Sequence, residues 1–353
     1  MPDMKLKVRP LNQFKLFWPL MVLLLLVIIN VFLTKDFFVI EWKDGRFSGI
    51  LVDILNRSTY IGIIAIGLTL VIATGGIDIS VGSVVAISGA VAAYLIGGEL
   101  VLQGDQQILV TRTPMAVAIP AALAVALVLG MWNGVLVTRW KIQPIVATLI
   151  LMVSGRGIAQ LVTNGQIITI YYTPYFFIGN GTFLGIPFSL YLLLAVLALV
   201  IVITRKTALG LFLESIGVNR TASRYSGIQE RRIVFWSYAF CAFCAGVSGL
   251  LVSSNVKSAD GNNAGDLFEL DAILAVVIGG TSLNGGKFSL GGSILGAIII
   301  QTLTTTIYSI GVPPQVNLVI KSIVVFLVSM LQSENFRALF LFGRKNAFAR
   351  GAV

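Results

Sequence analysis

Apolar segments long enough to cross a bilayer alternate with short polar connections along almost the whole chain. A hydrocarbon core about 30 Å thick needs roughly 20 apolar residues per helix, so we predict about ten spans. The eighth is short for a full crossing, and we expect a broken or partly buried helix there. The predicted spans cover residues 16–34, 54–74, 81–97, 115–138, 143–163, 187–204, 233–252, 270–281, 291–310 and 316–333.

The connections between these spans leave little room for a soluble domain. The first apolar run, 16–34, is too long for the core of a cleaved signal peptide, so we expect it to remain as the first span. We therefore predict an all-α transmembrane domain over 16–333, with cytoplasmic tails at 1–15 and 334–353. Its longest cytoplasmic connection is 205–232, and no connection is long enough to fold as a separate enzyme domain.

A polar break interrupts the apolar pattern at residues 73–83, ATGGIDISVGS. We predict that Gly75 and Gly76 end one helix and that Asp78 or Ser80 caps the next. Irregular backbone at membrane depth is tolerated only where protein or a water-filled path surrounds it. The break should therefore be buried among helices.

A second Gly-Gly break, at Gly279 and Gly280, has a similar setting between an apolar helix and a small-residue helix. Internal repeats are common in transporters, but chance similarity between two glycine-rich breaks is the alternative. Residues 280–289 also nearly match a phosphate-binding loop. Gly286 and Phe288 break the required spacing, so we expect ATP chemistry only from another chain.

Composition and charge agree with a membrane protein and exclude several other classes. Charged residues make up 11% of the 353 residues, against about 25% in soluble domains. The net charge of +10 comes from short loops, and most Lys and Arg fall on one side when the N-terminus is placed inside. This favours cytoplasmic termini over nucleic-acid binding.

Candidates for metal or redox chemistry are few. The chain contains no histidine, so histidine ligands and histidine proton relays are excluded. Cys241 and Cys244 lie within an apolar span without a second ligand pair, so we interpret them as core packing. We expect neither a metal nor a cofactor.

Charged residues within spans are costly and usually functional. Asp78 and Asp271 lie near predicted helix ends, where capping and the helix dipole explain them. Arg156 and Lys321 either pair with them or extend toward the membrane surface, and the sequence leaves both alternatives open.

The connection 205–232 contains a short helix predicted over 220–226. Asn219 suits its N-cap and Gly227 its C′ position, and small residues between Arg220 and Tyr225 would let a partner groove close over it. We favour a protein contact, although an ordinary solvated basic turn is the alternative.

Three segments in the same order, 74–82, 216–228 and 269–286, resemble the signature segments of permease subunits of ribose-type sugar ATP-binding-cassette importers. Residues 141–169 and 204–219 are most similar to the galactofuranose importer permeases within that family. A longer N-terminus and the loop 98–114 depart from the pattern.

The resemblance implies a ten-helix fold shared with vitamin B12-type importers, both termini cytoplasmic, in a bacterial inner membrane. It also implies a second permease subunit, an ATP-binding cassette subunit that hydrolyses ATP, and an extracytoplasmic sugar-binding protein. The chain itself would hold no catalytic residue. The coupling residues would be Glu214, Gly217, Asn219, Arg220, Ala222, Ser223, Tyr225 and Gly227.

The substrate implied is a monosaccharide, a furanose such as galactofuranose, with fructose, ribose, xylose or arabinose as alternatives. Sugar hydroxyls are matched by paired donors and acceptors, although amides also join membrane helices. An ion-coupled secondary carrier and a membrane-embedded enzyme are the rival functions. The candidate pathway amides are Asn133, Gln143, Asn164, Asn284 and Gln301.

Overall fold

The computed structural model describes residues 16–332, except positions 44, 98, 104–105, 111 and 312. The predicted tails 1–15 and 334–353 lie outside the described residues. Each predicted span coincides with a helix whose ends lie within a few residues of the prediction. These helices are α1 Phe17–Leu33, α2 Ile50–Ala73, α3 Val81–Ile96, α4 Met115–Thr138, α5 Pro144–Val162, α7 Phe188–Lys206, α10 Glu230–Val256, α11 Phe268–Ile278, α12 Leu290–Ser309 and α13 Pro314–Gln332.

Six of these helices are long and apolar enough to cross a membrane by length and composition: α2, α4, α5, α7, α10 and α12. The helix α11 has 11 residues, which agrees with the short eighth segment in the sequence. Large apolar side chains remain exposed on the outside of the bundle, as on Leu24, Leu149 and Leu199. Such a surface suits lipid rather than water.

Shorter elements fill the connections and were predicted only in part. The helix α8 Leu209–Val218 was missed, whereas α9 Arg220–Tyr225 was expected; α6 Phe177–Asn180 and a 3₁₀ turn at Thr173–Phe176 are also present. Four antiparallel strand pairs were not predicted. They join β1 Glu41–Lys43 to β2 Arg46–Ser48, β3 Glu99–Gln103 to β4 Gln106–Val110, β5 Ile167–Thr169 to β8 Ser258–Asp260, and β6 Thr182–Phe183 to β7 Ile186–Pro187.

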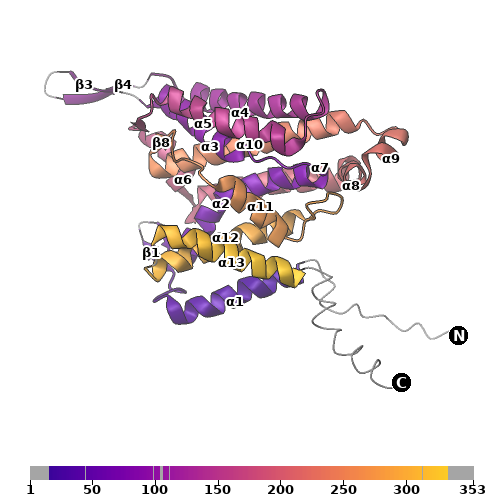
Figure 1. Cartoon of the computed structure of the whole chain (residues 1–353). Helices are drawn as coiled ribbons and strands as arrows, with labels where there is room; N and C mark the ends of the chain where they lie inside the picture. Colours follow the sequence, from indigo (N-terminus) through magenta and orange to yellow (C-terminus); the bar gives the residue numbers. More distant parts are fainter. Residues whose placement is uncertain are drawn as a thin grey trace.

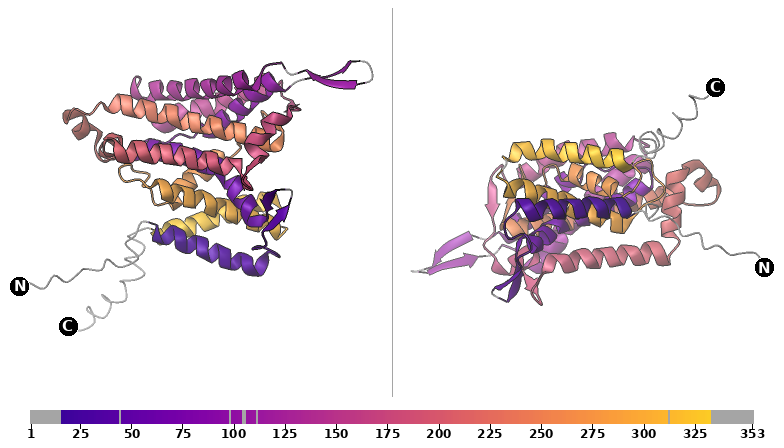
Figure 2. Two further views of the ribbon diagram at one scale, coloured as in Figure 1. Left: turned by 180° about the vertical axis from the view of Figure 1, so that it is seen from behind. Right: turned by 90° about the horizontal axis from the view of Figure 1, so that it is seen from below.

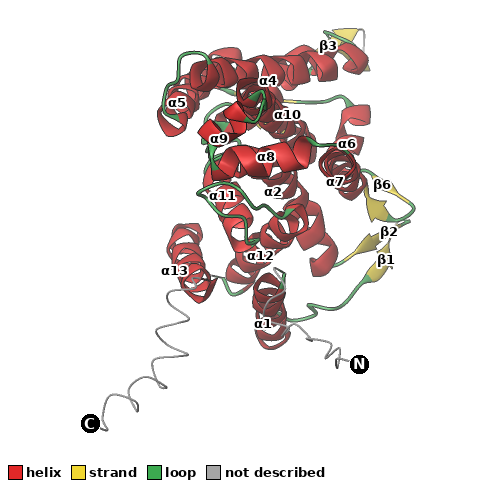
Figure 3. Ribbon diagram, turned by 90° about the vertical axis from the view of Figure 1, so that its right-hand side faces the viewer, coloured by secondary structure: helices red, strands yellow, loops and turns green. Residues whose placement is uncertain are grey.

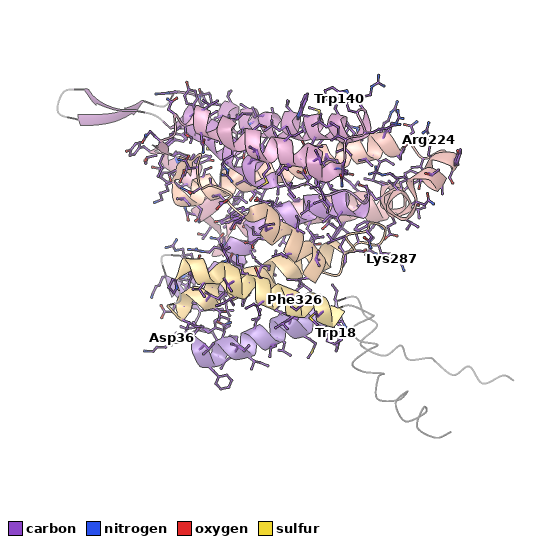
Figure 4. The ribbon with its side chains drawn as sticks, in the orientation of Figure 1. Trp18, Asp36, Trp140, Arg224, Lys287 and Phe326 are labelled. Atoms are coloured by element: carbon purple, nitrogen blue, oxygen red, sulfur yellow. The ribbon has the colours of Figure 1, made fainter. Side chains whose placement is uncertain are left out.

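The two ends of the helix bundle are built differently (Figure 1). One end carries α8 and α9, and Figure 3 looks directly onto it. The strand pairs lie at the other end. Figure 4 shows Arg224 and Lys287 at the first end and Asp36 at the second. We call these the α9 end and the hairpin end.

The helix α10 is the centre of the fold, with its largest contacts to α4, α2 and α3. Small residues allow this packing. A Cβ on Gly130 would lie 2.5 Å from Cβ of Ala242, and one on Gly67 would lie 2.8 Å from Cα of Cys241. Close backbone approach of this kind is a main source of helix association in membranes. The interpretation of Cys241 and Cys244 as core residues is confirmed by their complete burial.

The helices α1, α12 and α13 lie on the side of the bundle opposite α4 and α5 (Figure 2). Polar side-chain contacts join them to one another and to α11. Asn30 Nδ2 of α1 donates to Thr306 Oγ1 of α12 at 2.7 Å. Lys321 Nζ of α13 lies 2.8 Å from Asp271 Oδ2 of α11, with both side chains largely buried. Of the two basic residues that the sequence left open, Lys321 pairs with an aspartate. Arg156 does not, since its Nη1 donates to the carbonyl oxygen of Ala264 at 2.6 Å.

We predict that Lys321→Met destabilises the protein by about 3–5 kcal/mol, because it leaves the Asp271 carboxylate buried without its partner. The apparent melting temperature of the purified protein in detergent measures the effect. The double variant Lys321→Met with Asp271→Leu removes both charges and should recover most of the loss. Equal melting temperatures for Lys321→Met and the unaltered protein would contradict this assignment.

Candidate functional site

The helix α9 is held in place by the cap that the sequence predicts. Asn219 is extended, with φ −157°, and its side-chain oxygen accepts from the backbone N–H of Ala222 at 3.0 Å. Gly227 follows the helix with φ +83°, and its N–H donates to the carbonyl oxygen of Arg224 at 3.1 Å. The N-cap and the C′ glycine are confirmed, and the helix ends one residue earlier than predicted.

The exposed face of α9 is suited to a protein contact. The Tyr225 side chain is 88% exposed, and Arg220 and Ala222 are exposed beside it. Ser223 alone in the helix turns inward and is 5% exposed. A large aromatic side chain held in water on a rigid, capped helix is typical of an interface residue.

The α9 end also contains a contact of backbone against backbone, which we call the glycine junction. It consists of Ala73, Gly75, Gly217, Gly285 and Gly286. The N–H of Gly286 donates to the carbonyl oxygen of Ala73 at 2.9 Å. A Cβ on Gly217 would lie 2.0 Å from that same oxygen and 2.1 Å from the nitrogen of Gly286.

The glycine junction brings together three segments that are far apart in the sequence. Gly217 belongs to α8, Gly75 follows α2, and Gly285 and Gly286 lie in the loop after α11. A Cβ on Gly285 would lie 2.9 Å from the nitrogen of Gly75. Gly285 and Gly286 were not predicted as site residues, although two adjacent glycines with φ of +85° each mark a backbone that only glycine adopts readily.

A side chain of α9 adds a second link to the end of α2. Arg220 Nη2 donates to the carbonyl oxygen of Thr74 at 3.4 Å. Thr74 is the C-cap residue of α2 and is 1% exposed. The unit of α8 and α9 therefore contacts the α2 end through both backbone and side chain.

Most of the break after α2 is buried, as predicted: Thr74, Asp78 and Ser80 are buried, whereas Gly75 is exposed. Asp78 Oδ1 accepts from Ser80 N at 2.9 Å and from Ser80 Oγ at 2.6 Å. Ser80 is the N-cap residue by position, yet its side chain makes no cap bond. Ser80 therefore does not cap α3 with its side chain, whereas Asp78 accepts the backbone N–H of Ser80 directly before the helix and closes the turn into α3.

Neighbouring helices hold this turn in place. Asn133 Nδ2 of α4 donates to Ser80 Oγ at 2.9 Å, and Tyr238 Oη of α10 donates to the carbonyl oxygen of Ile77 at 3.4 Å. A Cβ on Gly76 would lie 2.5 Å from Tyr238 Oη. The second glycine of the break therefore makes room for a tyrosine from α10.

The second Gly-Gly break also ends a helix. Gly279 is the C-cap residue of α11, and Gly280 follows with φ +83°. A Cβ on Gly279 would lie 2.3 Å from the carbonyl carbon of Gly292, so α11 and α12 cross at their glycines. The loop that follows carries Gly285 and Gly286, so both breaks lead into the glycine junction.

The five candidate pathway amides do not form one site. Asn133 is buried beside Ser80, and Asn164 follows α5 toward the hairpin end. Gln143 precedes α5 at the α9 end, where Asn284 lies beside Gly75. Gln301 lines a hollow of its own.

That hollow lies toward the hairpin end and has a volume of about 340 Å³. Arg57, Gln301 and the Asp271–Lys321 pair line it. The Tyr60 hydroxyl oxygen, also in its wall, is buried and has no hydrogen-bond partner within the described residues. A buried hydroxyl without a partner costs free energy.

Comparison with known proteins identifies related chains. A family model described as branched-chain amino acid transport system / permease component matches residues 50–329. The galactofuranose transporter permease protein of Escherichia coli is 43% identical over 94% of both chains. The fructose import permease protein of Bifidobacterium longum is 38% identical over 94% of this chain and 91% of its own.

The ribose import permease protein of Escherichia coli is 34% identical over 89% of this chain and 92% of its own. No solved structure matches the chain.

We predict that Gly217→Ala disrupts the glycine junction, because its Cβ would meet two backbone atoms near 2 Å. Overpacking of this kind costs about 1–3 kcal/mol, which the apparent melting temperature in detergent measures. Gly157→Ala is the matched control, since Gly157 also lies in a helix, α5, and a Cβ there meets nothing within 4 Å. Equal stability of the two variants would contradict the tight contact.

Proposed function

The chain belongs to the branched-chain amino acid transport system / permease component family and is a multi-pass membrane subunit of an ATP-binding-cassette importer, not an enzyme; from this premise we propose its substrate, its partners and its path of coupling.

The proposed substrate is a monosaccharide in a furanose form, such as galactofuranose. Support comes from the three relatives described above, which are named for galactofuranose, fructose and ribose. All three sugars form five-membered rings. Fructose, ribose, xylose or arabinose are the alternative substrates in the same role, and binding assays of the extracytoplasmic sugar-binding protein against each sugar discriminate among them.

The proposed orientation places the α9 end in the cytoplasm, with both tails, 1–15 and 334–353, on that side of a ten-span fold of the vitamin B12-importer type. The positive-inside rule supports it. Exposed basic residues gather at the α9 end, namely Arg139, Lys141, Arg205, Lys206, Arg220, Arg224, Arg231 and Arg232. The helix α9 then faces the compartment that holds ATP.

The proposed partners are an ATP-binding cassette subunit, an extracytoplasmic sugar-binding protein and a second permease subunit, homologous or identical. The separation of the five pathway amides supports the second subunit. Two subunits around a shared axis would place a second set of polar groups beside the first, which gives a sugar more partners than one chain offers.

The observation that carries the proposed coupling is the glycine junction. The ATPase subunit would bind the exposed face of α9, where Arg220, Ala222 and Tyr225 lie. Since only Asn219 separates α9 from α8, the two helices would move as one unit. Packed backbones have discrete arrangements and deform little, so the displacement would pass from Gly217 to the α2 end and to the loop after α11.

The hollow that contains Tyr60 and Gln301 is the proposed outer sugar site. Sugar hydroxyls both donate and accept hydrogen bonds, and this wall offers both kinds of group. Arg57 and Lys321 donate, Asp271 accepts, and the Gln301 amide can do either. Its position toward the hairpin end places it on the side from which the sugar-binding protein would deliver.

An ion-coupled carrier is less compatible with the same residues. Such a carrier needs a carboxylate available to a coupling ion at membrane depth. Asp271 is paired with Lys321, and Asp78 accepts two hydrogen bonds from Ser80. Asp271 therefore has a charged partner, whereas Asp78 keeps one buried oxygen, Oδ2, without a partner within the described residues.

We predict that Ala222→Arg lowers sugar uptake at least about tenfold in the reconstituted complex, the effect of losing roughly 1.4 kcal/mol of docking free energy. The added side chain would hold the ATPase groove away from α9. Ala208→Arg is the control, because Ala208 is also an exposed alanine of the 205–232 connection but lies outside α9. Unchanged uptake in Ala222→Arg would remove α9 from the coupling path.

We also predict that Gln301→Leu raises the sugar concentration needed for half-maximal uptake about tenfold, since a lost hydrogen bond to a bound polar group costs roughly 1–3 kcal/mol. Basal ATPase activity should not change. Gln166→Leu makes the same substitution toward the hairpin end, outside the hollow, and should leave uptake unaltered. An equal half-saturation concentration in all three proteins would exclude the hollow as a sugar site.

A further inference from the structure

A second cavity opens between α7, α8 and α10, in the half of the bundle nearer the α9 end. Its volume is about 360 Å³, within the usual range for small-molecule sites. Apolar side chains form most of its wall, contributed by Val200, Ile203, Leu209, Leu213, Trp236 and Phe240.

The polar groups in this wall are occupied within their own helices. Thr204 Oγ1 donates to the carbonyl oxygen of Val200 at 2.7 Å, and Ser237 Oγ donates to that of Ile233 at 2.9 Å. Neither hydroxyl proton remains for a ligand. The interior is therefore unsuited to a sugar, which needs paired donors and acceptors, and suited to a hydrocarbon chain.

Positive charge surrounds this apolar interior on one side. Among the described residues that line the cavity, the one charged side chain is that of Arg232, in the first turn of α10. Arg205 and Lys206 are exposed in the last turn of α7, directly after the lining residues Ile203 and Thr204. An apolar cavity next to basic side chains is complementary to an amphiphile with an anionic head.

We propose that this cavity binds a phospholipid with an anionic headgroup, with an acyl chain between α7, α8 and α10 and the phosphate at Arg232. Trp236 supports the placement, since its side chain is 58% exposed beside the cavity and tryptophan is enriched where a membrane protein meets the headgroup region. Basic groups at the membrane surface attract anionic lipids.

A second copy of the chain is the less suitable occupant. A twofold contact centred on this face would bring Arg232, Arg205 and Lys206 against the same residues of the other copy, and like charges would repel. An anionic lipid neutralises them.

The lipid would also contact the helix that carries the glycine junction. Leu209 and Leu213 line the cavity, and Gly217 lies one turn further along α8. A chain packed there would hold α8 against α10. The lipid site is thus next to the proposed coupling path, but its test does not depend on transport.

The experiment uses a protein in which Trp236 is the only tryptophan, with Trp18, Trp42, Trp132 and Trp140 each replaced by phenylalanine. It is placed in nanodiscs of phosphatidylcholine that contain increasing fractions of phosphatidylglycerol. In paired samples one of the two lipids carries brominated acyl chains, which quench tryptophan fluorescence on contact. Both leaflets have the same composition, so the result does not depend on orientation.

We expect brominated phosphatidylglycerol to quench Trp236 with at least about fivefold higher relative affinity than brominated phosphatidylcholine, the effect of one basic contact. Arg232→Gln should abolish the preference. Arg231→Gln is the matched control, since the neighbouring Arg231 lines a different hollow and should retain it. Leu209→Phe places a larger side chain in the cavity without adding a tryptophan and should weaken quenching by both lipids.

Three results would overturn the proposal. Equal quenching by the two lipids would show an unselective lipid surface, and a preference that survives Arg232→Gln would place the anionic site elsewhere. Absence of quenching by either lipid would show that no acyl chain occupies the cavity.

Discussion

The architecture of the α9 end depends on one constraint: three backbone segments meet where no side chain fits. A Cβ on Gly217 would lie 2.0 Å from the carbonyl oxygen of Ala73, so α8 cannot move toward α2 without moving α2 or the loop that carries Gly286. Side chains in contact can change rotamer and absorb a displacement, but backbones pressed together cannot. In the proposed coupling, this stiffness would let a partner that binds the exposed α9 helix displace the end of α2.

The rest of the bundle follows the same logic of close approach and satisfied polar groups. Apolar helices gain little from leaving lipid, so close packing and hydrogen bonds between helices must stabilise the bundle. Gly130 and Gly67 bring α4 and α2 against α10, while the Asp271–Lys321 pair joins α11 to α13. In the proposed coupling, a rigid centre of this kind would pass movement at the α9 end to the inner helices as shifts of whole elements.

Apolar runs, glycine breaks and the Asn219 cap were sufficient to predict the long helices and α9, because each depends on local chemistry. The helix α8 was missed because ten residues between basic turns resemble a loop. The capping role of Ser80 was wrong because its hydroxyl donates to the Asp78 carboxylate, two residues away, rather than accepting from a first-turn amide of α3. The glycine junction and the hollow at Tyr60 join distant segments, and no local pattern reports which segments meet.

The most direct test of coupling through the glycine junction is hydrogen exchange of the assembled transporter with and without trapped nucleotide. The backbone amides to follow are those of residues 74–80 and 282–287. If α8 transmits the movement of α9 through the junction, the amides of both segments change their exchange protection in the same nucleotide state in which the amides of α8 and α9 do. A change confined to α8 and α9, with both segments unaltered, would contradict the account.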